Sequence, residues 1–559
     1  MDKGFQGDQA GRPPFELLRA IALEAIDTCS AGRAVTRSVT ASPGRLVLAG
    51  QPMRTMGAGR ILVLACGKVA APMFEAFVAR LRAAEVRRPV RALIVTPEGV
   101  PPSSAVAAVG HKVKVQATWM TGEHPIPARG SFRAGQAALR FMAQARGGDD
   151  VVALISGGGS SLMAAPLKPF LNAAEKSHVH QILVVSGAPI SAINAARRHL
   201  SALKGGRLAV AARRARSLTT LVVCDVDPDR YDEVASGPSV PDRTTLDDLI
   251  QVAGRYGLAP TLPPRVLEAL RTGRMPETPK PRDPVFRRAR AQMLLSNGDL
   301  RNAAVRAGLM RGLAAEAMPT EITGTVEAAV EMVARAIEGA PAGIRLLVLG
   351  GEVRTAPAAG GIGGRAQEMA LRLAMRMRNL AMRGWAFLAI GSDGRDGNSE
   401  AAGAFVDATT LERARTMGAD PDKSLQRSDT FRLFHRLGDT LMTGPTGTNV
   451  RDVYLLLTGL PRPLEIAPPP PALEPPASRP AVPGARPRPR PAGSSKPESS
   501  KPRPSRRRPR PRKPKRKPKQ TPKRAHKRPA RRPRGHSARR PAKRAPRKVG
   551  RRKDRRRRR

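Results

Sequence analysis

Short apolar runs of strand length alternate with helix-like stretches over the first 457 residues of the 559-residue chain. The runs cover residues 61–65, 92–96, 151–155, 221–224, 346–349, 386–390 and 453–457. Between them, stretches such as 15–28 and 326–337 carry apolar residues at helical spacing. This alternation is typical of parallel sheets covered by helices on both faces, and it predicts an α/β fold.

The length permits two lobes, because a domain typically takes about 100 to 200 residues. We expect an N-terminal lobe over residues 10–240 and a C-terminal lobe over residues 291–460. Residues 241–290 are rich in Pro and Arg with weak periodicity, and we interpret them as a connector between the lobes. A cleft shared by the two lobes is the predicted site.

Residues 467–559 form a separate basic tail that holds 38 of the 98 Lys and Arg residues but three of the 45 acids. The formal charge of +53 therefore divides into +35 for the tail and +18 for the rest. The tail consists mainly of Pro, Arg, Lys and Ala, and such a segment cannot bury enough apolar surface to offset the entropy cost of ordering, so we expect it to be disordered. Such a tail predicts non-specific, salt-sensitive nucleic-acid binding. A shift of reading frame in a GC-rich coding sequence is the alternative origin of these runs.

The cysteine content and the hydropathy pattern indicate the compartment. Three cysteines, Cys29, Cys66 and Cys224, are too few for a disulfide framework in a chain of this size, so a reducing cytoplasm is expected. No apolar run approaches the roughly 20 residues that span a bilayer, and a membrane location is not expected. The oligomeric state stays open.

Two glycine-rich turns follow predicted strands in the N-terminal lobe. Lys68 comes after Gly67 at the expected start of a helix, where free N–H groups and an ammonium attract phosphate or carboxylate. The alternative is a surface lysine after a turn. The second turn suits the phosphates of a nucleotide, since its glycines let backbone amides approach the phosphate oxygens closely. The alternative interpretation is a flexible turn before a helix that a serine hydroxyl caps. The residues of this second turn are Ser156, Gly157, Gly158, Gly159, Ser160 and Ser161.

Carboxylates and one arginine are further candidates. Asp225 ends the strand over 221–224, where it could hold Mg²⁺ or accept a hydroxyl proton, or simply cap a helix. Asp393 stands in SDGRDG, which also suits a tight turn without a ligand. Arg365 precedes a predicted helix, and its guanidinium could bind a transferred phosphoryl group. The GIGGRA segment at this arginine lacks the preceding strand that a dinucleotide fingerprint requires.

A polar set lies on a predicted helix after residue 190. Asn194, Arg198 and Ser201 share one face by spacing, and the alternative is a solvated face. His124 and His199 are isolated imidazoles without metal-ligand spacing, so a zinc site is not expected.

The chain from residue 15 to residue 457 resembles the glycerate 2-kinase family of the MOFRL type, which is also labelled hydroxypyruvate reductase. The motifs that carry the resemblance occur in the order of the family, and they are GKVA, GEHP, ISGGGSS, HLSALKGGRLA, VASGPSVPD, GGRAQE, SDGRDGNSEAAGAFVD and TGPTGTNVRD. The resemblance implies a Rossmann-like N-terminal lobe, a smaller α/β C-terminal lobe, and transfer of the γ-phosphoryl group of ATP to the 2-hydroxyl of D-glycerate with Mg²⁺.

The resemblance also implies roles for individual residues. Lys68 and Arg365 match the basic residues of the family's active site, and Asp225 and Asp393 are candidates for metal binding or for accepting the hydroxyl proton. Nucleotide contacts are expected from the 156–161 turn and from Thr446, Gly447 and Asn449. Contacts to the acceptor are expected from Asn194, Arg198, Lys204 and Glu352.

Two features depart from the family pattern. The segment DVDPDRYDE replaces a Pro-Gly-Asp type of turn, and Ala366 stands where the family usually has Asn after the arginine. Activity or substrate preference could differ accordingly. Two other functions remain open, namely a nicotinamide-dependent hydroxypyruvate reductase, which lacks a proper fingerprint, and an inactive kinase-like body with a nucleic-acid-binding role.

Overall fold

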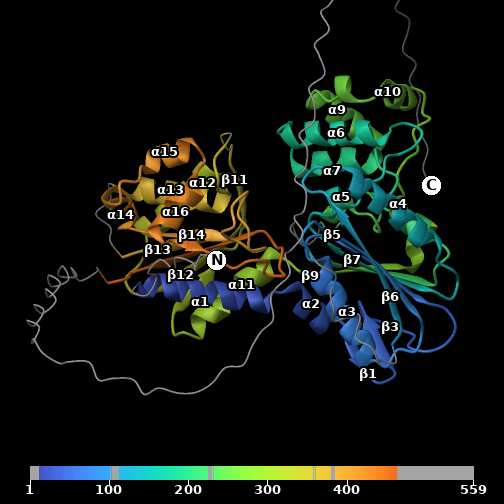
Figure 1. Ribbon diagram of the computed structural model, residues 1–559, viewed down its shortest axis with the longest axis horizontal. Helices are drawn as coiled ribbons and strands as arrows, with labels where there is room; N and C mark the ends of the chain where they lie inside the picture. Colours follow the sequence, from blue (N-terminus) through green and yellow to red (C-terminus); the bar gives the residue numbers. More distant parts are fainter. Residues whose placement is uncertain are drawn as a thin grey trace, which may run out of the picture. The chain divides into compact units, whose positions relative to one another are not determined.

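The computed structural model describes residues 12–100, 102, 113–223, 230, 232–356, 358, 360–378 and 384–461. The tail predicted over 467–559 and the candidate Asp225 lie outside these residues. Two large sheets and the helices packed on them form the described part of the chain (Figure 1). This architecture confirms the predicted α/β class. None of the helices in the described part combines the length and the apolar character that a bilayer span requires.

The first sheet contains six parallel strands in the order β6-β5-β4-β7-β8-β9. Their bounds are β4 Ile61–Cys66, β5 Val90–Pro97, β6 Val115–Gly122, β7 Asp150–Ser156, β8 Ser217–Val223 and β9 Ala289–Leu295. The neighbours β4 and β7 end side by side, since Cys66 is in register with Ile155. The loops that follow these two strands therefore meet at one edge of the sheet, where ligands bind in open parallel sheets.

Helices cover both faces of the first sheet, because alternate strand residues are apolar on each side. One face packs against α2 (Ala31–Ser38) and α3 (Ala70–Ala83), and the other against α4 (Arg129–Ala143) and α8 (Arg207–Ala211). Along β4, Ile61 and Val63 belong to the first core and Leu62 and Leu64 to the second. This alternation accounts for the continuous apolar run in the sequence.

The second sheet is mixed rather than parallel, which corrects the expectation of parallel sheets in both lobes. Its main path is β10-β12-β16-β13-β14-β15, with β11 also paired to β12. The strands are β10 Ala314–Ala317, β11 Ile322–Thr325, β12 Arg345–Arg354, β13 Ala386–Gly391, β14 Gly403–Asp407, β15 Thr440–Leu441 and β16 Asp452–Thr458. β16 runs antiparallel between β12 and β13. A strand buried on both faces is apolar in either direction, so its sequence does not reveal its orientation.

Helices from distant parts of the chain cover the second sheet (Figure 1). One face carries α12 (Val326–Glu338), α13 (Arg365–Met377), α14 (Thr410–Thr416), α15 (Pro421–Gln426) and α16 (Thr430–Leu437). The other face carries α11 (Asn297–Leu309) and the N-terminal helix α1 (Pro13–Thr28). Phe15 of α1 stacks on Phe405 of β14 with ring centroids 5.0 Å apart. The first helix of the chain therefore packs on the sheet formed by its C-terminal half.

A small helical layer completes the N-terminal half. It contains α6 (Ala173–Val185), α7 (Ile190–His199), α9 (Leu246–Arg255) and α10 (Pro264–Arg271), which share a core that includes Leu183, Leu249 and Val266. The helices α9 and α10 lie inside the segment that the sequence suggested as a connector. The short helix α5 (Gly159–Leu162) follows β7, and the hairpin strands β1 (Thr40–Ser42), β2 (Arg45–Leu48) and β3 (Gln51–Met53) form a separate three-stranded sheet.

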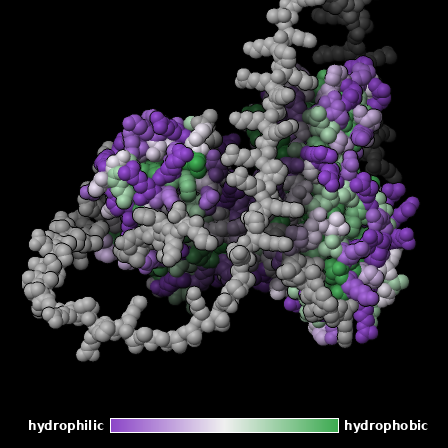
Figure 2. Space-filling view, in the orientation of Figure 1, coloured by the Kyte–Doolittle hydropathy of each residue, from purple (hydrophilic) through white to green (hydrophobic). Residues whose placement is uncertain are grey.

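The visible surface of the described residues is mainly hydrophilic, with small separate hydrophobic patches (Figure 2). Val185 at the end of α6 and Met310 after α11 are among the exposed large hydrophobic side chains. Single exposed hydrophobic residues are normal for folded proteins and require no partner.

An ion pair lies buried at the amino ends of the first sheet. Asp150, the first residue of β7, accepts hydrogen bonds from Arg88 at 2.5 Å and from Arg216 at 2.5 Å. Neither Asp150 nor Arg88 has any exposed side-chain surface. Arg88 also donates to the backbone carbonyls of Gly59, Arg60 and Gly148, so it joins the loop before β5 to the loops before β4 and β7.

Replacing Asp150 by Asn should lower the free energy of unfolding by about 3 to 5 kcal/mol, because it leaves the Arg88 guanidinium buried without a counter-charge. Glu268→Gln, which removes an exposed ion pair to Arg271, serves as the control and should cost less than about 1 kcal/mol. Urea unfolding followed by circular dichroism measures both. Equal effects of the two substitutions would contradict a structural role for the buried pair.

Candidate functional site

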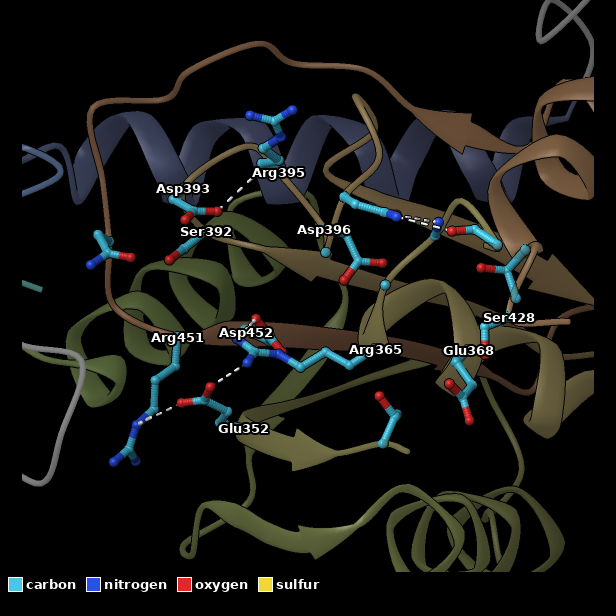
Figure 3. A pocket seen from close by; sticks show the side chains of 18 of the residues that line it. Glu352, Arg365, Glu368, Ser392, Asp393, Arg395, Asp396, Ser428, Arg451 and Asp452 are labelled. Atoms are coloured by element: carbon cyan, nitrogen blue, oxygen red, sulfur yellow. Dashed lines mark hydrogen bonds and ion pairs between the residues drawn. The ribbon is translucent and has the colours of Figure 1, made fainter. Parts of the chain in front are cut away.

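A cleft of about 810 Å³ collects most of the predicted motifs. Its walls come from the loops after β4 and β7, from β12, from the glycine-rich loop before α13, and from the loops beside β13 and β16. Figure 3 shows the part of this lining that the second sheet and its loops supply. The charged residues that line the cleft are Lys68, Arg365, Arg395, Arg451, Glu352, Glu368, Asp393, Asp396 and Asp452.

The backbone places Lys68 at the edge of the first sheet. Gly67 has a φ of +135°, and a Cβ there would lie 2.1 Å from the Ser156 hydroxyl, so only glycine fits this turn. The Lys68 N–H donates to the carbonyl of Gly157 at 2.9 Å, and the Val69 N–H donates to the Ser156 hydroxyl at 3.3 Å. The two glycine-rich turns predicted from the sequence are therefore joined to each other.

The Lys68 ammonium forms an ion pair with Asp393, with 2.7 Å between Nζ and Oδ2. Asp393 follows β13, so the pair connects a loop of the first sheet to a loop of the second. The side chains are 34% and 22% exposed, which leaves both within reach of a ligand in the cleft. The structure thus brings together two residues that the sequence suggested separately.

Two neighbouring residues of the GEHP motif have different surroundings: Glu123 binds the start of α4, and His124 lines the cleft. The Glu123 carboxylate accepts hydrogen bonds from the N–H groups of Gly130 and Ser131 at 2.8 Å, at the start of α4. Burial opposes ionisation there, but these bonds lower the pKa of Glu123 to about 2. His124 lines the cleft, and desolvation together with the charge of Lys68 lowers its pKa to about 4. A neutral imidazole therefore stands beside the Lys68 ammonium at neutral pH.

Two carboxylates hold the Arg365 guanidinium (Figure 3). Asp452 accepts from Nε at 2.6 Å and from Nη2 at 3.0 Å, and Glu352 accepts from Nη1. Burial alone would lower the pKa of Arg365, but Asp452 and Glu352 outweigh it and raise the pKa. Burial also raises the pKa of Asp452 against the influence of Arg365. Arg365 is thus oriented by a bidentate pair, the geometry that fixes a guanidinium most firmly.

A carboxylate also occupies the N-terminus of α13. Asp396 accepts hydrogen bonds from the N–H groups of Ala366 at 3.0 Å and Gln367 at 2.9 Å. Gly364 must be glycine here, because a Cβ would lie 2.3 Å from the Asp396 carboxylate. Burial raises the pKa of Asp396 to about 6, even though the N–H groups of Gln367 and Ala366 act to lower it. The side chain of Ala366 is fully buried, so this residue contributes packing and a backbone donor.

The predicted nucleotide residues of the last motif differ in their surroundings. Asn449 lines the cleft, and its buried Nδ2 has no acceptor among the described residues. Thr446 donates to the carbonyl of Ser392 at 2.5 Å, and the carbonyl of Gly447 accepts from Ala31 at 2.9 Å. Thr446 and Gly447 therefore shape the turn and attach it to the start of α2, whereas Asn449 faces the cleft.

In the turn after β7, Gly158 lines the cleft, flanked by Lys68 and His124. Ser156 is fully buried, Ser161 donates to the carbonyl of Pro125 at 2.5 Å, and Ser160 lies 2.6 Å from the Ser236 hydroxyl. Most of the hydroxyls in this turn are thus engaged with protein groups.

Of the residues expected to contact the acceptor, Glu352 lines the cleft and the other three do not. Asn194 is buried on α7, Lys204 is fully buried, and Arg198 pairs with Asp242 at 3.2 Å. The shared face predicted for Asn194, Arg198 and Ser201 is wrong for Ser201, because α7 ends at His199. Ser201 instead forms an isolated antiparallel β-bridge with Pro166.

The lining offers five acidic and four basic side chains, so the cleft itself carries no surplus of positive charge. Within the described ranges, no group of three or more His, Cys, Asp or Glu side chains is arranged to hold a metal ion. Mg²⁺ is usually bound by one or two carboxylates together with phosphate oxygens and water. The partly exposed carboxylates of Asp393 and Glu352 fit that requirement.

Several residues of the site were not singled out as site residues from the sequence. Asp452 is the most important, because it holds Arg365 in a bidentate pair. It lies in the TGPTGTNVRD motif, but its partner could be found only by knowing that β16 pairs with β12 and β13. Asn398 is another such residue. Its side chain accepts a hydrogen bond from the Gly363 N–H and donates one to the Gly361 carbonyl, and these two bonds fix the glycine-rich loop.

Residues 17–271 match a family described as a domain of unknown function (DUF4147), and residues 345–452 match the MOFRL family. The chain is 32% identical over 338 residues to the "D-glycerate 2-kinase" of Thermotoga maritima, and the aligned part covers 59% of this chain and 78% of that protein. It is 38% identical over 362 residues to a "Putative hydroxypyruvate reductase" of Agrobacterium vitis, and the aligned part covers 63% of this chain and 80% of that protein. The crystal structure of glycerate kinase from Thermotoga maritima superimposes with a TM-score of 0.64 at 28% identity, covering 80% and 99%.

The raised pKa of Asp396 predicts a specific dependence of stability on pH. An Asp with a pKa of 3.8 when unfolded and about 6 when folded binds its proton more tightly in the native state. Stability therefore falls as the pH rises from about 4 to about 6. Asp396→Asn lacks this titration, so the stability of the wild type relative to this variant should be greater at pH 4 than at pH 7, by at most about 3 kcal/mol.

Asp420→Asn is a matched control with the opposite sign. Asp420 accepts from the Lys423 N–H at the start of α15, and this hydrogen bond lowers its pKa. The stability of the wild type relative to Asp420→Asn should therefore increase as the pH rises from acid toward 7. Chemical unfolding at a series of pH values measures both differences, and a difference independent of pH for Asp396→Asn would contradict the burial argument.

Proposed function

Since the chain belongs to the glycerate kinase family of the MOFRL type, we propose that it transfers the γ-phosphoryl group of ATP to the 2-hydroxyl of D-glycerate. The observation that carries this proposal is that Lys68, after β4 of the first sheet, and Arg365, at the start of α13 on the second sheet, line one cleft. Phosphoryl transfer requires positive groups around the moving phosphoryl group and little covalent chemistry from the protein. Two cations fixed at separate walls of one cleft meet that requirement.

In this proposal, the polyphosphate of ATP lies beside Lys68 and the backbone at Gly158, with Asn449 as a donor. The unpartnered Nδ2 of Asn449 supports this placement, because a buried donor without an acceptor costs free energy until a ligand supplies one. Glu352 would hold Mg²⁺ together with phosphate oxygens, and the ion supplies charge neutralisation when it is bound, while the Asp393 carboxylate stays available for the hydroxyl proton. The near balance of acid and base in the lining supports a requirement for a divalent cation.

The proposed reaction forms a bond between the acceptor oxygen and the γ-phosphorus and breaks the bond between that phosphorus and the β-γ bridging oxygen. Lys68 shifts from Asp393 toward the phosphoryl group, and Arg365, kept in orientation by Asp452, stabilises the charge on its oxygens. Asp393 then accepts the hydroxyl proton. Asp225, the other candidate for this role, lies outside the described residues.

A nicotinamide-dependent reductase is less well supported by the site. A dinucleotide binds with its pyrophosphate at the N-terminus of a helix after a glycine-rich loop. At α13, the Asp396 carboxylate already accepts from the N–H groups of Ala366 and Gln367. A pyrophosphate there would meet a buried carboxylate instead of free donors.

The function is tested by incubating the purified protein with ATP, Mg²⁺ and D-glycerate and identifying the product by phosphorus NMR. We expect 2-phosphoglycerate, and we expect no oxidation of NADH or NADPH with hydroxypyruvate. Formation of 3-phosphoglycerate would refute the assignment of the acceptor hydroxyl, and reductase activity without phosphoryl transfer would refute the proposal as a whole.

Lys68→Met and Arg365→Met should each lower kcat by about 10²- to 10³-fold, since each removes a charge that stabilises the transition state. The controls are Lys423→Met and Arg271→Met, which change exposed residues of the same types with side chains 70% and 73% exposed. Steady-state kinetics of the four variants, with circular dichroism as a check of folding, measure the effect. Full turnover in folded Lys68→Met would contradict the mechanism.

For the basic tail, we propose non-specific binding to nucleic acid, on the ground of its 38 Lys and Arg residues. The affinity of the full chain for a random DNA duplex should fall steeply with salt, with a slope of about 0.9 per neutralised phosphate. A shortened chain that ends at Ile466 should lose this binding and keep its turnover. Binding that survives the truncation would assign the role to the rest of the chain.

A further inference from the structure

Two adjacent arginines on α7 have opposite surroundings. Arg198 is buried and donates to Asp242 at 3.2 Å and to the carboxylate of Asp232 at 3.4 Å. Arg197, one residue earlier, has no carboxylate partner among the described residues. Because a buried cation is normally paired, this difference distinguishes a structural arginine from one that lacks its anion.

The contacts of the Arg197 guanidinium are few and neutral. Nη1 lies 3.5 Å from the amide oxygen of Asn194, and Nη2 lies 3.1 Å from Nε2 of His180. The same ring nitrogen lies 3.1 Å from the carbonyl of Pro125, so it can accept from Arg197 only when it carries no proton. The Nε of Arg197 is buried without any acceptor. In either tautomer of His180, the guanidinium has no anionic partner and at least one donor is unsatisfied.

Two buried lysines lie near Arg197, and neither has a carboxylate partner among the described residues. Lys176 donates to the carbonyl of Leu200 at 3.0 Å, and Lys204 lies 3.4 Å from the carbonyl of Met163, so both side chains contact neutral oxygens. Burial lowers the pKa of Arg197 to about 10. Burial and the charge of Arg197 lower the pKa of Lys176 to about 7. Burial and the charges of Lys176 and Arg197 lower the pKa of Lys204 well below its usual value. An anion bound at Arg197 would favour the protonated form of both lysines, so binding of an anion and charging of the cluster support each other.

This cationic cluster adjoins the cleft through the GEHP segment. His124 lines the cleft beside Lys68, and the charge of Arg197 is one of the causes that lower the pKa of His124. The next residue, Pro125, contacts His180 through its carbonyl, and His180 contacts Arg197. The guanidinium is thus close to the wall of the cleft that holds Lys68.

A chain of polar groups approaches Arg197 from the other side. The Ser160 and Ser236 hydroxyls lie 2.6 Å apart, Ser236 donates to the Asn194 amide oxygen at 2.9 Å, and Asn194 contacts Arg197. Ala235 and Ser236 have φ values of +51° and +58° without being glycine. Such left-handed backbone is unfavourable and clusters at ligand sites. The strained turn places a hydroxyl next to the cation.

We propose that Arg197 binds the carboxylate of the acceptor substrate, a small 2-hydroxy acid, and so determines the preference of the enzyme for acids over neutral alcohols. The planar guanidinium fork matches a carboxylate in two hydrogen bonds, and the Ser160, Ser236 and Asn194 groups suit the hydroxyls of the same molecule. The inference deepens the proposed function and rests on it. The acceptor hydroxyl then lies on the Lys68 side, toward the phosphoryl group.

The test compares the wild type with Arg197→Met and Arg197→Lys in steady-state kinetics of the full chain. For Arg197→Met, the KM for D-glycerate should rise about 50- to 100-fold, kcat should stay within about threefold, and the KM for ATP should not change. Arg197→Lys should recover part of the loss. With glycerol, which lacks the carboxylate, kcat/KM should be the same in the wild type and in Arg197→Met.

Thermal unfolding separates binding from structure. Arg197→Met should keep the melting temperature of the wild type, because it removes a cation without a counter-charge, whereas Arg198→Met should lower it by leaving Asp242 buried and unpaired. An unchanged KM for D-glycerate in Arg197→Met would overturn the inference, as would a rise in the KM for ATP, which would assign the guanidinium to a phosphate.

Calorimetric titration with D-glycerate in the absence of nucleotide distinguishes failure of this inference from failure of the proposed function. If the wild type binds D-glycerate and Arg197→Met does not, Arg197 holds the acid even when no phosphoryl transfer is detected. If the wild type turns over D-glycerate and both proteins bind it equally, the function stands and the inference is wrong. If the wild type neither binds D-glycerate nor phosphorylates it, both are wrong.

Discussion

Carboxylates hold the two central cations of the cleft in place before any ligand is bound. Asp393 pairs with Lys68 at 2.7 Å. Asp452 accepts two hydrogen bonds from Arg365, and Glu352 accepts a third. Donors fixed in this way need little reorganisation when charge develops nearby, which is the condition for electrostatic catalysis. The same pairing leaves little free positive charge for a polyanion. A polyanion therefore gains more from this wall when a divalent cation accompanies it.

The glycine-rich loop before α13 follows the same principle. Asp396 satisfies the donors at the start of the helix, and Asn398 bonds to Gly361 and Gly363. Protein groups thus give the loop its shape and occupy the position where a helix would otherwise attract phosphate. This agrees with the proposed function, in which an anion in the cleft binds at Lys68 and at the backbone of Gly158 and not at this helix. The arrangement also explains why a sequence pattern that resembles a dinucleotide fingerprint does not form that site.

Much of the fold was predictable, because strands buried on both faces produce apolar runs that the sequence displays directly. The runs at 61–65 and 453–457 both correspond to strands, β4 and β16. The antiparallel direction of β16 was not predictable, since it depends on long-range pairing. For the same reason Lys68, Arg365 and Asp393 could be recognised from local motifs, whereas the pairing of Arg365 with Asp452 could not. Arg197 and Arg198 are indistinguishable in sequence, and the positions of Asp242 and Asp232 separate their roles.

The charges in the molecule are distributed unequally between the two sides of the proposed reaction. On the wall that holds Arg365, carboxylates compensate the cations, which suits a nucleotide that brings its own divalent cation. Near Arg197, the side chains of Lys176 and Lys204 contact only neutral oxygens. Such surroundings suit a ligand that arrives as a bare anion. Two anionic substrates that must react with each other repel, and each also competes for any free cation. Separate compensation of the two sites reduces that competition, because each substrate is favoured where the other gains least.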